Sequence, residues 1–228
     1  MLKVTKFGGS SMADAGQYRK VRDIVLADKA RRVVVVSAAG KRDSKDHKLT
    51  DLLYLCFAHI QYGVDCTPIY DMITSRYLEI RDELGLQLDL ESEFAALRKK
   101  LDKKEISQDE LVSRGEYFSA KLLAALLDFQ FVDAADWIRF NFDGTVNKES
   151  SYSAFCTYAK KGKGIVTPAS TALCPMVPFI PSPAAAVILP VRWQLPHWMR
   201  ISMRTGRMFP AFSWQIPGSW RIPAPFPR

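Results

Sequence analysis

The chain has 228 residues, of which 48% are hydrophobic and 25% are charged, a balance that argues against disorder throughout its length. It contains no run of 18 apolar residues, and the N-terminal segment MLKVTKF lacks the apolar core and cleavage site of a secretory signal, so we expect a cytoplasmic protein. Of the net charge of +8, residues 169–228 carry +6, from six arginines, because residues 1–168 carry 26 Lys and Arg against 24 Asp and Glu. A nearly neutral first part predicts neither a nucleic-acid partner nor binding to an anionic membrane.

Residues 1–168 are predicted to alternate between strands and helices. We expect strands at residues 2–7, 32–37, 129–135 and 164–167, and helices at about 15–28, 50–62, 68–84, 91–103, 107–128 and 150–160. The four consecutive valines at 33–36 predict a strand that is buried on both faces, as in a parallel sheet. Strands that alternate with helices predict an α/β sheet with crossover connections.

The first candidate site follows the first strand, where KFGGSS occupies residues 6–11. Gly8 and Gly9 allow the backbone to approach a ligand closely, and their N–H groups can form a nest for anionic oxygens. Lys6 supplies a positive charge for a phosphate, and the helix that begins soon afterwards can direct its N-terminus at the same group. The spacing matches neither a Walker loop nor a dinucleotide motif. An ordinary Gly-Gly turn beside a solvated lysine is the alternative interpretation.

The second candidate is VSRGE at residues 112–116, inside the helix that a capping-box pattern opens at Ser107. A glycine in the middle of a helix costs about 1 kcal/mol relative to alanine, so Gly115 indicates close approach by a ligand or by another backbone. The neighbouring Glu116 can bind a substrate ammonium. A surface salt bridge from Glu116 to Arg114 or Lys121 is the alternative.

The third candidate combines SAAGK at residues 37–41 with LTDLL at residues 49–53. Ligands of open α/β sheets collect at the carboxyl ends of strands, which is where Ser37 is expected. Thr50 would then begin the next helix with its hydroxyl directed at a ligand, or it would serve only as the N-cap. The four cysteines form no CxxC pair and are expected to be reduced thiols, with no metal ligands among them.

Taken together and in this order, the motifs resemble those of the aspartate kinases, within the amino-acid kinase superfamily. FVDAAD at residues 131–136 and GIVTP at residues 164–168 also resemble landmarks of that family, and the match extends over residues 1–168. The resemblance implies a three-layer αβα sandwich with a mainly parallel sheet, the amino-acid kinase fold, which would be incomplete here at its C-terminal side.

The resemblance also implies an activity. ATP would phosphorylate the β-carboxylate of L-aspartate to give 4-phospho-L-aspartate, the entry to lysine, threonine and methionine synthesis, with Mg²⁺ bridging the phosphates and no general base. The intact enzyme is expected to be a cytoplasmic homodimer with no nucleic-acid or membrane partner. By motif position, the ATP phosphates would be held by Lys6, Gly8, Gly9 and Ser10, with Lys6 also catalytic, and L-aspartate would be held by Ser37, Thr50 and Glu116.

Residues 169–228 depart from the family. They contain 11 of the 13 prolines, four of the five tryptophans and no Lys, Asp or Glu, a composition that is unusual for a soluble surface. When the tail is back-translated and read one base earlier, residues 169–186 can encode GFYGSMPDGTIHTFSRGG, which resembles the missing family segments. Because Trp and Met each have a single codon, they restrict this fit. We therefore predict that one base is missing near the Pro168 codon.

Two domain-level expectations follow from this hypothesis. Residues 1–168 would be the N-terminal part of a catalytic domain, and residues 169–228 would be an out-of-frame tail, non-native or disordered. The chain would then be truncated and inactive as written, and its strands would keep unpaired edges. The alternative is a non-catalytic remnant whose basic, Pro- and Trp-rich tail binds a partner.

Overall fold

The computed structural model describes residues 3–159, 162–169 and 212–215. Its strands are β1 (Lys3–Phe7), β2 (Arg31–Val36), β3 (Gln130–Phe131), β4 (Ile165–Pro168) and β5 (Phe212–Gln215). Its helices are the 3-10 helix η1 (Gly9–Met12), α1 (Ala15–Leu26), α2 (Leu49–Gln61), α3 (Thr67–Leu84), α4 (Leu90–Asp102), α5 (Gln108–Leu127), α6 (Ala134–Trp137) and α7 (Lys148–Ala159).

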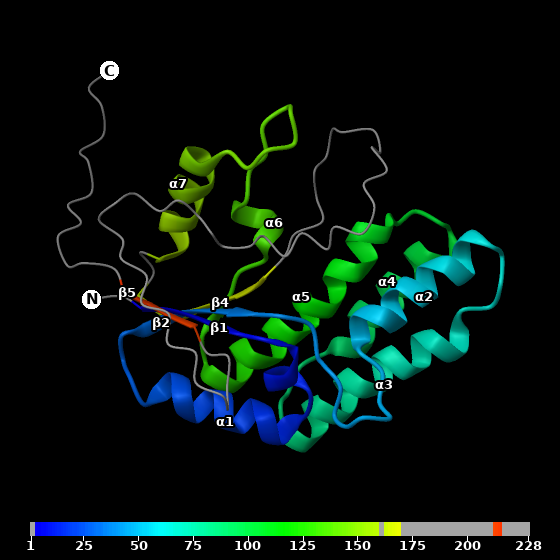
Figure 1. Cartoon of the computed structure of the whole chain (residues 1–228), viewed down its shortest axis with the longest axis horizontal. Helices are drawn as coiled ribbons and strands as arrows, with labels where there is room; N and C mark the ends of the chain where they lie inside the picture. The colour runs from blue at the N-terminus through cyan, green and yellow to red at the C-terminus, as the bar shows by residue number, and fades with distance from the viewer. Residues whose placement is uncertain (1–2, 160–161, 170–211, 216–228) are drawn as a thin grey trace.

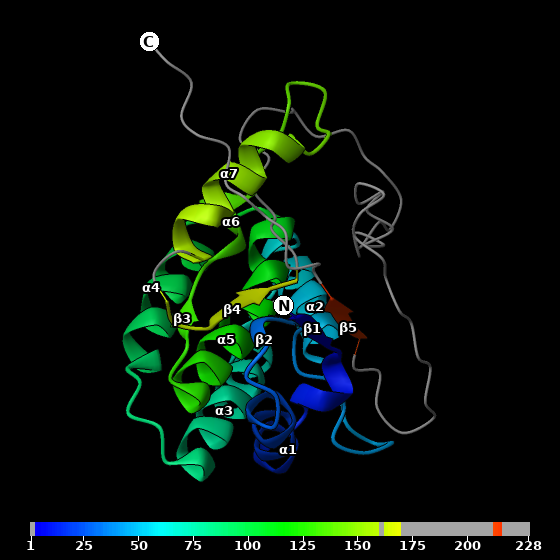
Figure 2. The same ribbon diagram turned by 90° about the vertical axis from the view of Figure 1, so that its left-hand side faces the viewer.

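The strands form one sheet in the order β3-β4-β2-β1-β5, with β3 and β5 at its two edges (Figure 2). Four of the strands run parallel, and β5 alone pairs antiparallel, with β1. The sheet connects by crossovers, since β1 and β2 are joined through α1 and β3 and β4 through α7. The predicted α/β class with a mainly parallel sheet is confirmed.

Helices lie on both faces of the sheet. In Figure 1, α1 and α5 lie on one face, α6 and α7 lie on the other, and α2, α3 and α4 extend beyond one end. The valine run in β2 behaves as predicted, because Val33, Val34 and Val36 are buried between the layers. All four residues of β4 are buried too. Burial of both faces is the physical reason that these strands are continuous apolar runs rather than alternating ones.

The helices α3, α4 and α5 pack around an aromatic group. The ring of Phe118 lies 4.5 Å from that of Phe94 and 5.5 Å from that of Tyr77, measured between centroids. The capping-box prediction is confirmed in part, since the Ser107 hydroxyl accepts a hydrogen bond from the backbone N–H of Glu110 at 3.1 Å. The Glu110 carboxylate pairs with Lys100 instead of returning to the cap.

Two sequence predictions are corrected by the fold. The strand predicted over residues 129–135 ends at Phe131, because the Asp133 side chain caps the backbone N–H of Ala135 and α6 begins there. In the tail, where no strand was expected, β5 pairs with β1 from Lys3↔Gln215 to Lys6↔Phe212. The strands were expected to keep unpaired edges, and at β1 this edge is instead paired with β5. The rest of the tail prediction lies outside the described residues.

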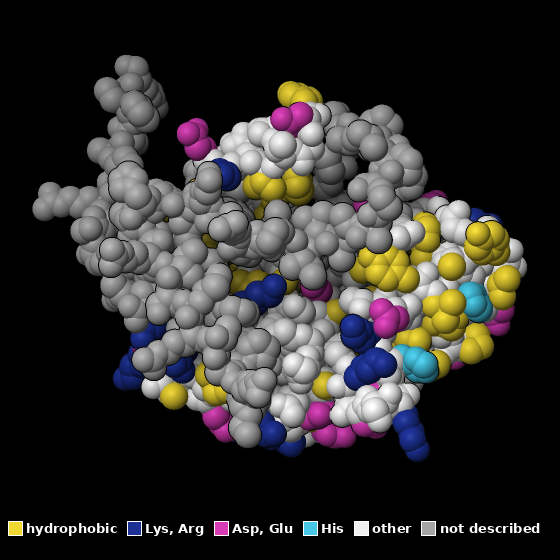
Figure 3. All heavy atoms as spheres, viewed as in Figure 1, with side chains coloured by type: hydrophobic (Ala, Val, Ile, Leu, Met, Phe, Trp, Pro, Cys, Tyr) yellow, Lys and Arg dark blue, Asp and Glu magenta, His cyan; other side chains and the backbone are white. Residues whose placement is uncertain are grey.

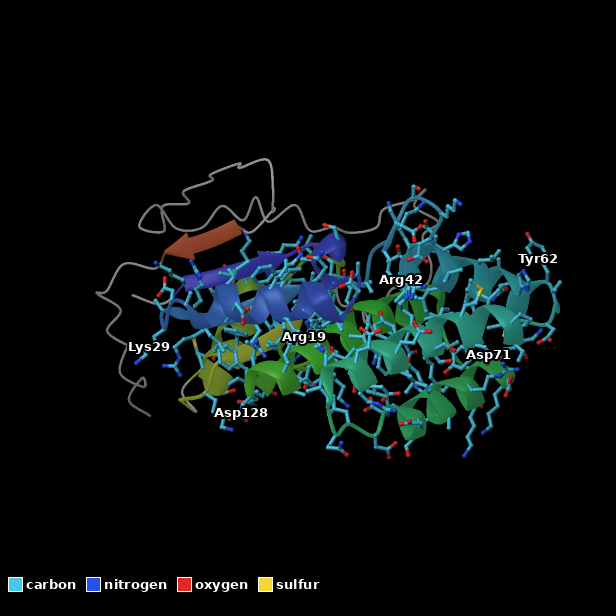
Figure 4. The ribbon with its side chains drawn as sticks, turned by 90° about the horizontal axis from the view of Figure 1, so that it is seen from below. Arg19, Lys29, Arg42, Tyr62, Asp71 and Asp128 are labelled. Carbon is cyan, nitrogen blue, oxygen red and sulfur yellow. The ribbon has the colours of Figure 1, made fainter. Side chains whose placement is uncertain are left out.

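Apolar side chains are exposed at the C-terminal end of α2 and just after it. Tyr62 is 84% exposed and lies at the tip of the α2–α3 hairpin (Figure 4), and Val64 is exposed beside it in sequence. Figure 3 shows hydrophobic side chains gathered at this end of the molecule. None of the helices in the described ranges is long and apolar enough to cross a membrane.

Candidate functional site

The three sequence motifs meet at the carboxyl edge of the parallel sheet. The loop after β1 and the loop after β2 run side by side, because the backbone N–H of Ser37 donates to the Phe7 carbonyl at 3.1 Å and that of Gly40 donates to the Gly9 carbonyl at 2.8 Å. Figure 4 labels Arg42, which lies on the second loop. Parallel strands direct their carboxyl ends to one edge, and this is where ligands collect in such sheets.

The two loops touch through their glycines. A Cβ atom on Gly40 would lie 2.7 Å from the carbonyl carbon of Gly9 and 2.9 Å from the backbone nitrogen of Ser10. A Cβ atom on Gly9 would lie 2.9 Å from the Ala38 carbonyl oxygen. Neither Gly9 nor Gly40 has a positive φ, so both positions require glycine because of close backbone approach rather than backbone conformation.

The start of α2 is attached to the same loop. The backbone N–H of Leu49 donates to the Ala39 carbonyl at 3.3 Å. Helix α2 begins at Leu49 and its N-cap is Lys48, so the interpretation of Thr50 as a plain N-cap is wrong. Thr50 lies half-buried in the first turn, and the structure records no hydrogen bond of its hydroxyl with any described residue.

Helix α5 reaches this edge at Gly115. A Cβ atom there would lie 2.9 Å from Cδ1 of Leu53 and 3.0 Å from Cβ of Ala38. The close approach that the mid-helix glycine indicated is therefore made by protein atoms of α2 and of the loop after β2. Glu116 follows directly and is half-buried.

The two basic residues that offered an alternative explanation for Glu116 have other acidic neighbours. Lys121 pairs with Glu93. The Arg114 guanidinium lies 3.9 Å from the Asp133 carboxylate and 4.6 Å from the Tyr117 ring centroid. The Arg114–Asp133 contact connects the VSRGE motif to the FVDAAD motif.

Lys6 brings a positive charge to the edge. It pairs with Val35 in the sheet, and its side chain is half-buried. Within residues 3–159, 162–169 and 212–215, no hydrogen bond or ion pair of its ammonium is recorded, whereas Lys3, on the same strand, pairs with Asp28 at 2.7 Å. Close to Lys6, η1 begins after Gly8, and the N–H groups of its first residues, including the exposed Ser10, have no acceptor within that helix.

A buried ion pair that the sequence analysis did not identify holds the loop after β2. The Arg76 side chain is 5% exposed; it donates to the Asp46 carboxylate at 2.5 Å and to the Gly40 carbonyl at 3.3 Å. Partial burial acts to raise the pKa of Asp46, but backbone hydrogen bonds from Arg42 and His47 and the charge of Arg76 outweigh it, and the pKa is about 2. An arginine between apolar positions of a helix was the signal that could have identified this pair.

Tyr77, the next residue of α3, was also not identified. It is fully buried and its hydroxyl donates to the Gly115 carbonyl at 2.6 Å. Burial is the main cause that raises the pKa of Tyr77, and the negative charge of Glu116 is a weaker one. The hydroxyl therefore remains a proton donor. A tyrosine four residues after Ile73 in a helix is predicted to be a core residue, and its sequence position alone does not reveal the bond to Gly115.

The site thus combines a cation, backbone N–H donors, hydroxyls and a carboxylate at one edge of the sheet. The residues on the paired loops lie together, Thr50 joins them through the Leu49–Ala39 bond, and Glu116 joins them through the Gly115–Ala38 contact. A cation with N–H donors suits an anionic group, and a carboxylate suits an ammonium. Among the described residues, no group of three or more His, Cys, Asp or Glu side chains is placed to hold a metal ion.

Comparison with known proteins gives consistent matches. The family model described as "Amino acid kinase family" matches residues 1–169. Aspartokinase 3 of Bacillus subtilis (strain 168) is 36% identical over 138 residues, which are 58% of this chain and 30% of that protein.

Among solved structures, the aspartate kinase of Clostridium acetobutylicum is 39% identical with a TM-score of 0.69, over 72% of this chain and 38% of that one. Aspartokinase III of E. coli, in complex with aspartate and ADP, has a TM-score of 0.61 at 22% identity, over 73% of this chain and 40% of that one, and supports the fold alone. The chain spans between 30% and 40% of the length of these relatives.

Proposed function

The chain belongs to the amino acid kinase family, and from that premise we propose that residues 1–168 are the N-terminal part of an aspartate kinase catalytic domain. The predicted resemblance to aspartate kinases is confirmed by the relatives at 36% and 39% identity. The proposed reaction transfers the γ-phosphoryl group of ATP to the β-carboxylate of L-aspartate. The observation that carries the proposal is the convergence of all three motifs on residues 38–40.

The proposed roles follow the chemistry of the groups at the edge. Lys6 and the N–H groups of the loop at residues 8–10 offset the charge of the transferring phosphoryl group. Glu116 binds the α-ammonium of aspartate, and Ser37 and Thr50 bind its carboxylates. An oxygen of the β-carboxylate forms a bond to the γ-phosphorus while the bond to the departing ADP oxygen breaks. Because this carboxylate is already ionised, catalysis requires positioning and charge stabilisation rather than a base.

Mg²⁺ would neutralise phosphate charge when it arrives with ATP. The described residues offer no cluster of metal ligands, so the proposal assigns the ion to the phosphate oxygens and gives no residue of this chain a metal-binding role. We also propose that the intact enzyme is a cytoplasmic homodimer.

Residues 169–228 have a separate proposal, that they are translated out of frame. The support is their composition, with no Lys, Asp or Glu, and the family-like segments that the shifted frame encodes. The chain as written would then lack the family segments that the shifted frame encodes after residue 168, and it would be inactive.

Two forms of the gene test these proposals, the chain as written and a form with one base restored near the Pro168 codon. Both products are assayed for ATP-dependent formation of aspartyl hydroxamate. We expect activity from the restored form and none from the chain as written. A restored product that is folded but inactive with aspartate would overturn the proposed substrate, and turnover by the chain as written would overturn the proposed inactivity.

Matched variants of the restored form test the residue roles. Lys6→Met and Glu116→Gln are expected to lower kcat/KM at least about 100-fold, the usual loss when a charge-stabilising group is removed. Lys3→Met is the control on β1, since Lys3 pairs with Asp28 at the opposite end of the strand. Glu110→Gln is the control on α5, since Glu110 pairs with Lys100. Control activities within about twofold of the unmodified enzyme, with large losses in the other pair, would support the assignment.

A further inference from the structure

Two consecutive residues of α3 bind two different site segments. Arg76 donates to the Gly40 carbonyl in the loop after β2, at 3.3 Å, and Tyr77 donates to the Gly115 carbonyl in α5, at 2.6 Å. Neither residue belongs to a sequence motif. We propose that Arg76 and Tyr77 are positioning residues, which together fix the loop at residues 38–48 relative to Glu116; their link to aspartate binding rests on the proposed function.

The Tyr77 hydroxyl lies at the junction between three elements. The residue is fully buried, and its hydroxyl oxygen would lie 3.7 Å from a Cβ atom on Gly115, whose other neighbours would be Leu53 of α2 and Ala38. Loss of this hydroxyl would leave the Gly115 carbonyl without one donor in a dry environment. The turn of α5 that carries Glu116 would therefore move more freely against the loop after β2.

Arg76 fixes the other side of the junction. Its guanidinium holds the Gly40 carbonyl and the Asp46 carboxylate at the same time, and Asp46 accepts from the backbone N–H of Arg42 at 2.8 Å. The loop is therefore closed at both its ends by one side chain. Because Gly40 touches Gly9, this closure also determines where the glycine loop after β1 lies.

The chain offers matched controls on the same helix. The Tyr70 hydroxyl donates to the Phe94 carbonyl of α4 at 2.6 Å, the same bond type and length as that of Tyr77. Like Arg76, Arg81 donates to one backbone carbonyl and one carboxylate, which are those of Leu88 at 3.0 Å and Glu91 at 2.5 Å. The tyrosine control removes a bond of the same type and length away from the site. The arginine control removes the same pair of acceptors from a more exposed place, since the Glu91 carboxylate is 56% exposed and that of Asp46 is 11% exposed.

The test is hydrogen–deuterium exchange of the full chain, read by mass spectrometry in peptides from residues 38–48 and 111–118. Loss of one buried hydrogen bond changes an opening equilibrium by roughly two- to tenfold. We expect Tyr77→Phe to accelerate exchange by this factor in 111–118, and Arg76→Lys to do so in 38–48. Tyr70→Phe and Arg81→Lys are expected to leave both segments unchanged.

Equal acceleration in the site variants and their controls, or none in either, would overturn the inference. A second readout is the KM for aspartate in the frame-restored enzyme. Tyr77→Phe should raise this KM about three- to tenfold while kcat changes less than twofold. A fall in kcat with an unchanged KM would contradict positioning of the aspartate-binding segment. If the enzyme without substitutions neither binds nor phosphorylates aspartate, the proposed function fails, and the exchange data still decide whether Arg76 and Tyr77 fix these segments.

Discussion

Replacement of Gly40 by alanine should destabilise the protein more than replacement of a glycine at a turn. The added Cβ would lie 2.7 to 2.9 Å from three backbone atoms of Gly9 and Ser10, where ordinary contacts begin at 3.4 Å. The two loops must therefore separate by about 0.5–0.7 Å, and overpacking of this kind costs roughly 1–3 kcal/mol. The hydrogen bond from the Gly40 N–H to the Gly9 carbonyl, now 2.8 Å long, would weaken, which adds about 0.5–1.5 kcal/mol.

The expected total is about 2–4 kcal/mol in the free energy of unfolding. For a chain of this length that corresponds to a fall in Tm of roughly 5–12 °C, measured by circular dichroism at 222 nm and checked by urea unfolding. Gly85→Ala is the control, because Gly85 has a φ of 67° at the end of α3 with nothing within 4 Å of the added Cβ, and it should cost only about 1 kcal/mol. A Tm loss for Gly40→Ala no greater than that of the control would refute the close-contact argument.

Three further predictions concern pH, thiol reactivity and packing. The pKa of Asp46 is lowered to about 2, so its ionised form stabilises the fold above pH 4. The free energy of unfolding of the native chain should exceed that of Asp46→Asn by about 1–2 kcal/mol at pH 7. In urea titrations this difference should shrink as the pH falls from 4 to 2, and a constant difference would contradict the prediction. Burial, and to a lesser extent the neighbouring thiol of Cys66, raises the pKa of Cys56 to about 12. Iodoacetamide at pH 8 should therefore modify the half-buried Cys156 and leave Cys56 unmodified until denaturant is added. Mass analysis of the peptides would show which cysteine is modified. Gly164→Ala should destabilise by about 1–3 kcal/mol, since its Cβ would lie 2.3 Å from the Phe129 ring; an unchanged Tm would count against it.

The strand–helix alternation and the predicted location of the candidate site follow from local sequence. The valines of β2 and the glycines after β1 each constrain the few residues around them, and the periodicity of apolar positions identified the long helices. The strand predicted over residues 129–135 was wrong beyond Phe131 because the Asp133 side chain begins a helix inside an apolar run. A side-chain cap of this kind competes with strand propensity over two or three residues, and the apolar pattern does not reveal which prevails.

The sequence by itself determined which residues could carry the chemistry, because a lysine, two glycines and a carboxylate have the same chemical capacities in any fold. Only the tertiary structure decided how they are held. Gly40 lies against Gly9, and Arg76 and Tyr77 bind carbonyls that are 36 and 38 residues away in the chain. Contacts between such distant residues depend on how helices and strands pack in three dimensions, and the local periodicity that predicts each element contains no record of them.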